Sequence, residues 1–241
     1  MPDSSIVVKS LASNFSTFIN SDLIPRLKLI VTTPFTQPDL LWLVIPLIFV
    51  LFAIQLYFGR NRTEQLGWNT AFGNSVSLFW VIVLLLRFTL EDTPLSELLG
   101  GRAYKELILI VILAVWTIIL LSFDYYHIIP RKLAFLLSSS IPINTIAFLF
   151  IVIILGDVPF DSTTAVAGVV LLLLVALFFK TLRSVIKPSP SAEKTLEVHK
   201  LKRKGLRELR KERIKRKFQR VKERIKEGTI KLKEKFSPRK L

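Results

Sequence analysis

Residues 163–179 read TTAVAGVVLLLLVALFF, and this stretch decides the fold class. It carries no charge, it is followed by Lys180, and the chain beyond Pro188 is strongly basic. A helix needs roughly 20 predominantly apolar residues to cross the hydrocarbon of a bilayer, and flanking interfacial side chains lengthen a shorter run. The stretch therefore predicts a membrane-spanning helix.

Four further apolar runs are long enough to span a membrane in the same way. They are Leu40–Phe58, Asn69–Leu90, Leu107–Phe123 and Leu133–Leu155. Lipid-spanning strands would alternate apolar and polar residues, whereas these runs are continuous. Apolar residues make up 51% of the chain. The sequence predicts an all-α fold, a polytopic membrane bundle of five helices within residues 39–187.

Residues 1–38 form a separate N-terminal segment. Its apolar residues recur at helical spacing with polar residues between them, as an amphipathic helix requires: Val8, Leu11, Phe15, Phe18 and Ile19. Such a helix lies in the membrane interface or packs across the bundle. The alternative is a short helix that ends before Pro25. Pro34 and Pro38 predict the turn into the first span, and the segment lacks the compact apolar run of a signal peptide.

The short loops predict the orientation, because Lys and Arg accumulate on the cytoplasmic side. With the C-terminal tail inside, the inner loops hold Arg60 and Arg62, then Arg131 and Lys132, while the outer loop 156–162 has two acids and no basic residue. Basic residues in the other outer loop and in the N-terminal segment oppose this bias: Arg102, Lys105, Lys9, Arg26 and Lys28. We expect a multi-pass protein of the cell membrane with the N-terminus outside.

The loop between the first two spans has the most distinctive local sequence. It contains Tyr57-Phe58-Gly59-Arg60 and then Gly67-Trp68-Asn69-Thr70-Ala71. Gly59 suits a left-handed helix end, Trp68 suits the membrane interface, and Asn69 suits a helix cap. The segment resembles one in uncharacterised multi-pass membrane proteins of archaea. That resemblance covers about 20 residues and implies a membrane protein without an assigned activity.

Two clusters of polar residues interrupt the second and fourth spans. They define a predicted intramembrane polar site at Asn69, Asn74, Ser75, Ser138 and Asn144. Polar residues inside lipid turn toward neighbouring helices or toward a water-filled cavity. The site is therefore either a helix-packing contact, with a hydrogen bond between the two spans, or a functional pocket. Pro142 predicts a kink in the fourth span, with Ser138 bonding the carbonyl that the proline frees.

The sequence offers little for catalysis. The absence of Cys excludes disulfides and thiolate chemistry, and the two His residues belong to no metal-binding pattern. Asp124 and Asp157 lie at opposite ends of the predicted bundle and are interpreted as solvated loop charges. Arg87 is expected to pair with Glu91 one turn later. We predict no enzymatic activity, no metal and no cofactor.

Residues 188–241 hold 21 of the 34 Lys and Arg but 7 of the 18 acids, giving this tail a net charge of +14. We predict a Pro/Ser hinge at 188–192 and a basic cytoplasmic helix over 193–241, supported by pairs such as Glu212 with Arg216. Its predicted polyanion-binding residues are Lys202, Arg203, Lys204, Arg207, Arg210, Lys211, Arg213, Lys215, Arg216, Lys217, Arg220, Lys222, Arg224 and Lys226.

Three partners suit such a tail. Apolar residues Ile214, Phe218, Val221, Ile225 and Leu232 favour pairing of helices in a homo-oligomer, although Gly228 interrupts them. Anionic lipid headgroups and ribosomal RNA both attract the cations. By analogy with insertases that combine spans and a basic tail, we expect a ribosome tether in membrane-protein biogenesis. The alternative is a small transporter or channel whose tail anchors it to lipid.

Overall fold

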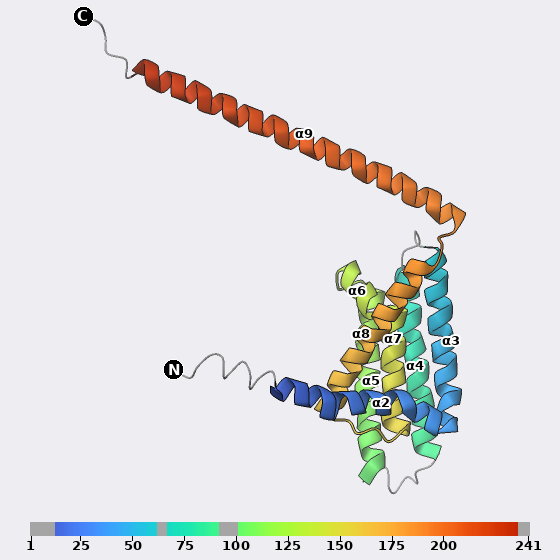
Figure 1. Ribbon diagram of the computed structural model, residues 1–241. Helices are drawn as coiled ribbons and strands as arrows, with labels where there is room; N and C mark the ends of the chain where they lie inside the picture. The colour runs from blue at the N-terminus through green and yellow to red at the C-terminus, as the bar shows by residue number, and fades with distance from the viewer. Residues whose placement is uncertain (1–12, 62–66, 92–100, 236–241) are drawn as a thin grey trace, which may run out of the picture. The chain divides into compact units, whose positions relative to one another are not determined.

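The computed structural model describes residues 13–61, 67–91 and 101–235. All regular structure in these ranges is helical, as predicted. Five spans long and apolar enough to cross a membrane confirm the predicted number. They are α3 (Pro38–Arg60), α4 (Trp68–Glu91), α5 (Gly101–Tyr126), the pair α6 (Arg131–Leu137) and α7 (Ser140–Leu155), and α8 (Ser162–Val185), which pack together as a bundle (Figure 1).

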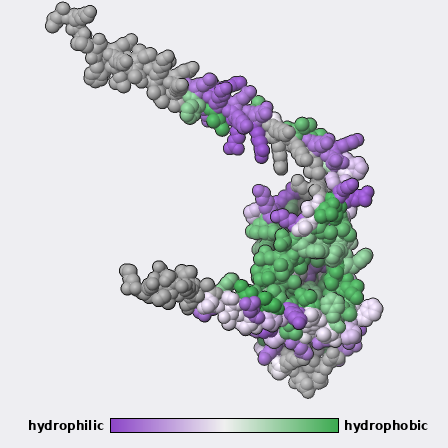
Figure 2. All heavy atoms as spheres, viewed as in Figure 1, coloured by the Kyte–Doolittle hydropathy of each residue, from purple (hydrophilic) through white to green (hydrophobic). Residues whose placement is uncertain are grey.

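The bundle is apolar inside and outside. Its core is formed by side chains such as Leu78, Leu85, Leu113 and Ile143, which are almost fully buried. Large apolar side chains also cover the outer surface, among them Trp42, which is 78% exposed, and Phe49, at 71%. Figure 2 shows this surface as a continuous apolar band with polar residues at both ends. A soluble monomer rarely exposes so large a patch, so the surface is suited to lipid.

The N-terminal helix continues past Pro25. Residues 13–18 are helical, a π-helical segment follows at Ile19–Leu23, and α2 runs from Ile24 to Thr36. A helix that ends before Pro25 is therefore wrong. The π segment directly precedes this proline, and in it Ile24 donates to the carbonyl of Ile19. Such a bulge accommodates the clash and the missing donor that proline introduces.

Helix α2 crosses the bundle near one end of the spans (Figure 1) and contacts α3, α7 and α8. It buries Ile30, Thr33 and Pro34. The predicted turn between Pro34 and Pro38 lies at Gln37, which has an extended backbone. Pro34 itself is inside α2, and Pro38 is the first residue of α3. Phe15 is exposed and Phe18 partly buried, while Val8 and Leu11 lie outside the described residues.

The fourth span is broken rather than kinked. Helix α6 ends at Leu137 and α7 begins at Ser140, and Ser139 between them has an extended backbone with ψ of 158°. Pro142 consequently lies in the first turn of α7, where its lack of an N–H costs no intrahelical hydrogen bond. The break leaves polar backbone inside the bundle that other helices must satisfy.

The chain divides into two compact units, residues 1–187 and 188–241. In the second unit α9 runs from Pro190 to Lys235. The predicted hinge over 188–192 is too long, since Pro190 is the first residue of the helix, a position that favours proline. Ser189 precedes the helix, and its hydroxyl accepts from the backbone N–H of Ala192 at 3.3 Å.

Candidate functional site

A chain of polar side chains connects three spans at the end of the bundle where α3 and α8 finish. Nε2 of Gln55 on α3 donates to Oγ of Ser140 on α7 at 2.7 Å. The Arg183 guanidinium on α8 donates to Oε1 of the same Gln55. Gln55 is only 1% exposed and Ser140 only 4%. Both ends of the Gln55 amide are therefore satisfied by other helices, as burial away from water demands.

Gly59 allows α3 and α8 to approach closely beside this chain. A Cβ at Gly59 would lie 2.7 Å from Cδ1 of Ile186, closer than real Cβ atoms come to a neighbour. The predicted left-handed helix end at Gly59 is wrong, because α3 continues to Arg60 and Gly101 is the glycine with positive φ among the described residues. The glycine is explained by close packing instead.

Asn74 satisfies the break in the fourth span. Its Nδ2 donates to the backbone carbonyl of Ser138 at 2.8 Å. In an unbroken helix that carbonyl would accept from residue 142, which is proline and has no N–H. Asn74 on α4 thus supplies the donor that Pro142 lacks. The Ser138 hydroxyl does not take this role, since it is buried without a hydrogen-bond partner among the described residues.

We expect Asn74→Ala to lower the free energy of unfolding by about 1 kcal/mol, because the Ser138 carbonyl loses its donor. In a Pro142→Ala background the helix can continue through the break, and the new N–H can donate to that carbonyl. The same Asn74→Ala change should then cost measurably less. Unfolding of the four proteins in mixed micelles gives the coupling, and equal costs in both backgrounds would show that the two residues act independently.

Asp124 is buried, which contradicts its interpretation as a solvated loop charge. It lies on α5, is 2% exposed, and its Oδ2 accepts from Oγ of Ser75 at 2.8 Å. Its Oδ1 is buried and has no hydrogen-bond partner in the described part of the chain. Asp157, by contrast, is exposed in the loop after α7. The packing of α4 against α5 therefore removes one of the two carboxyl groups from water.

The structure brings together only part of the predicted polar site. Asn74 and Ser138 are in contact, and Ser75 contacts Asp124. Asn144 donates to the Ser140 carbonyl of its own helix at 2.7 Å. Asn69 is exposed in the first turn of α4, which begins one residue earlier, so its predicted role as the N-cap is wrong.

Sequence reasoning missed Gln55, Ser140 and Arg183. Gln55 had a usable signal, since it is the one amide in the run Leu40–Phe58 and an amide in lipid needs a partner. Arg183 follows the apolar run and looked like an ordinary cationic flank. Only the approach of α3 to α8 shows that its guanidinium turns inward.

Asn144 and Thr145 also border a small cavity of about 160 Å³. Its other walls are apolar side chains, including Val31, Leu51 and Phe148. Lining of this kind does not resemble a polar path across the bundle. Both polar residues are buried in α7, and Asn144 bonds within its own helix.

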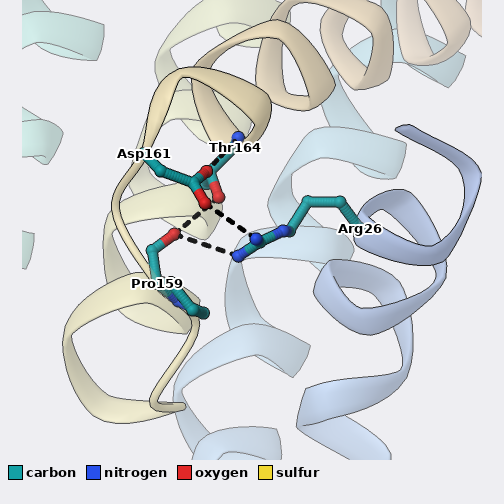
Figure 3. A network of polar contacts seen from close by, with 4 residues as sticks. All are labelled: Arg26, Pro159, Asp161 and Thr164. Carbon is teal, nitrogen blue, oxygen red and sulfur yellow. Dashed lines mark hydrogen bonds and ion pairs between the residues drawn. The ribbon is translucent and has the colours of Figure 1, made fainter. Parts of the chain in front are cut away.

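A second polar network lies at the opposite end of the bundle (Figure 3). The Arg26 guanidinium on α2 donates to Oδ2 of Asp161 at 2.8 Å and to the Pro159 carbonyl at 3.3 Å. Oδ1 of Asp161 accepts from the backbone N–H of Thr164 at 2.7 Å and caps α8. The Thr164 hydroxyl donates to the same Pro159 carbonyl at 2.5 Å. The network ties α2 to the loop that precedes α8.

The hydrogen bond from the Thr164 backbone N–H, followed by the charge of Arg26, holds the pKa of Asp161 below its usual value of 3.8. A lowered folded-state pKa stabilises the fold above the usual value, and this contribution is lost as the pH falls through the folded-state pKa. We expect hydrogen exchange at the Thr164 amide, corrected for the intrinsic rate, to accelerate on acidification. Asp161→Asn should remove this acid dependence, and Asp39→Asn should retain it. Identical acid responses in all three proteins would contradict the assignment.

The second unit presents cations on every side of α9. The described basic side chains from the predicted polyanion-binding set are all exposed: Lys202, Arg207, Arg210, Lys211, Arg213, Lys215, Arg216 and Lys217. Arg216 lies 3.6 Å from Glu212, the predicted pair, and Arg87 lies 3.4 Å from Glu91. The side chains of Arg203, Lys204, Arg220, Lys222, Arg224 and Lys226 lie outside the described ones.

Among the residues the structure describes, no group of three or more His, Asp or Glu side chains could hold a metal ion. Comparison with known proteins found no matching family model, no matching curated protein and no matching solved structure.

Proposed function

We propose that this membrane protein binds polyanions through α9 and tethers ribosomes to the cell membrane during membrane-protein biogenesis. The observation that carries the proposal is the exposure of every described cation of the predicted set along a helix of 46 residues. A phosphate backbone releases condensed counterions when such cations bind, which provides affinity without base-specific contacts. Phe218 is exposed and could stack on a base, but aromatic residues are too few for sequence readout.

The positions of the apolar residues on α9 favour RNA over a flat membrane surface. Leu209 and Phe218 are both exposed and nine residues apart, which places them about 180° apart around an ideal helix. Leu201 and Ile214 are likewise on roughly opposite sides. An interfacial helix needs one continuous apolar face. The phosphates of a folded RNA can approach a helix from several sides, so binding to RNA requires no continuous apolar face.

The proposal places the tail in the cytoplasm and the N-terminus outside, as the loop charges predict. Because the chain has no Cys, single cysteines at Ser162 and Ser184 would report the two faces without background. In intact cells, an impermeant maleimide should label only position 162.

The test is co-sedimentation of proteoliposomes that contain the full chain with ribosomes over a salt series. We expect ribosome binding that persists near physiological salt and that is lost on deletion of residues 188–241. Phosphatidylglycerol vesicles serve as the control that shows whether the tail prefers ribosomes to anionic lipid. Stronger binding to phosphatidylglycerol vesicles, or loss of ribosome binding at that salt, would make the tail a lipid anchor instead.

One observation favours a second candidate, a small transporter or channel. Asp124 and Gln55 are buried polar groups within spans, and ionisable residues in such positions often mark solute or proton paths. Solute flux that persists after removal of the tail would support this function. We propose no enzymatic activity and no cofactor for either candidate.

A further inference from the structure

A groove lies beside the network of Figure 3, between the start of α5 and the loop that joins α7 to α8. Its volume is about 520 Å³, within the usual range for ligand-binding clefts. Lys105, Glu106 and Asp157 supply charges at its border, and Ile108, Ile112 and Phe160 supply apolar walls. The groove therefore combines both signs of charge with a hydrocarbon-like surface.

The loop that forms one wall is held in place by several contacts. Pro159 accepts hydrogen bonds from Arg26 and Thr164, and Asp161 pairs with the same arginine. Gly156 has no room for a side chain, since a Cβ would lie 2.5 Å from a Thr33 methyl group on α2. Asp157 has a left-handed backbone with φ of 59°, which is costly for a residue other than glycine and persists only when the surroundings fix it.

The groove lies level with the ends of two candidate spans, which is where the headgroup region of a bilayer is expected to begin. Lys105 and Glu106 are within the first turn of the span that starts at Ala103, and Asp157 comes just after the span that ends at Leu155. Ile108 and Ile112 extend the apolar wall one and two turns deeper, and both are exposed on the outside of the bundle. An acyl chain could follow this wall while its headgroup stays with the charges.

We propose that the groove binds a zwitterionic phospholipid with an ammonium headgroup, such as phosphatidylethanolamine. The two carboxylates suit the ammonium group, and the Lys105 ammonium suits the phosphate. The hydrocarbon of the lipid covers Ile108 and Ile112, which the protein itself leaves exposed.

Native mass spectrometry of the full-length, delipidated protein tests this site with phosphatidylethanolamine and phosphatidylglycerol as probes. The wild type should retain the ethanolamine lipid preferentially. The double variant Glu106→Gln/Asp157→Asn should lose about tenfold in affinity for it, as expected for one charge-assisted contact, and should no longer discriminate between the two lipids.

The matched control is Asp39→Asn/Glu91→Gln. These carboxylates border a different cavity, between α3 and α4, at the same end of the bundle. The control should retain the wild-type preference. Unchanged retention in the first variant, or equal loss in both, would overturn the proposal. If the first variant fails to fold, Ile112→Trp fills the apolar wall without a charge change and should lower retention of both lipids, whereas unaltered retention would refute the site.

Discussion

Replacement of six exposed cations of α9 by Gln is expected to lower ribosome affinity on the order of a thousandfold near 0.1 M salt. The log–log salt slope should also become shallower by about 4 to 5, because each lost phosphate contact removes about 0.7 to 0.9. Gln preserves the helix, as its propensity is close to that of Lys and Arg. The six positions are Arg207, Arg210, Lys211, Arg213, Lys215 and Lys217.

The control for this prediction exchanges Arg and Lys at the same six positions, which keeps the charge and alters the side-chain geometry. Binding without base readout should tolerate the exchange within a few-fold, since phosphate contacts of this kind depend mainly on charge. Sedimentation of proteoliposomes with ribosomes measures both variants. A large loss in the charge-preserving variant would instead indicate specific guanidinium contacts, and no loss in the Gln variant would remove α9 from the interaction.

Gln55→Leu is expected to destabilise the bundle by about 2 kcal/mol, more than the roughly 0.6 kcal/mol typical of hydrogen bonds between membrane helices. The larger cost follows because Gln55 accepts from a guanidinium, and hydrogen bonds to charged groups contribute more than neutral ones. The Ser140 hydroxyl also loses its donor. Reversible unfolding in mixed micelles measures the change.

A double-mutant cycle separates this hydrogen-bond chain from simple packing. With Arg183→Leu added, no guanidinium is left beside the apolar side chain at position 55, so the double variant should recover to within about 1 kcal/mol of wild type. Gln37→Leu is the matched control, since Gln37 is partly buried at the start of α3 and makes no side-chain capping bond. Additive losses at Gln55 and Arg183 would show that the two side chains stabilise the bundle separately.

The spans could be predicted because their signal is cumulative. Each run is long and predominantly apolar, so length and composition predict the number of spans, even though one span consists of two helices. The break at Ser138–Ser139 was not predicted in detail. Proline predicts a disturbance, but whether the helix bends or ends depends on a donor elsewhere, here Asn74 on α4. That donor becomes relevant only after the helices have packed.

The interior contacts depend on tertiary structure in the same way. Asp124 is near the end of its span, where a carboxyl group is usually hydrated, but it is buried in the packed bundle and accepts from Ser75 on α4. Asp161 and Arg26 are 135 residues apart, and no local pattern relates them. The sequence shows where the polar residues lie along the chain, but it does not predict which residues they contact.

The donor that Asn74 supplies to the broken span predicts that positions 74 and 142 change together in evolution. Where Pro142 is present, we expect a short amide at position 74 to be retained because it donates to the Ser138 carbonyl. Where a relative has replaced the proline and continued the helix, position 74 is free to become apolar. An exchange of Asn for an aliphatic residue should therefore accompany loss of the proline across descendants of a common ancestor. A comparison of related sequences would show such paired change without any purified protein.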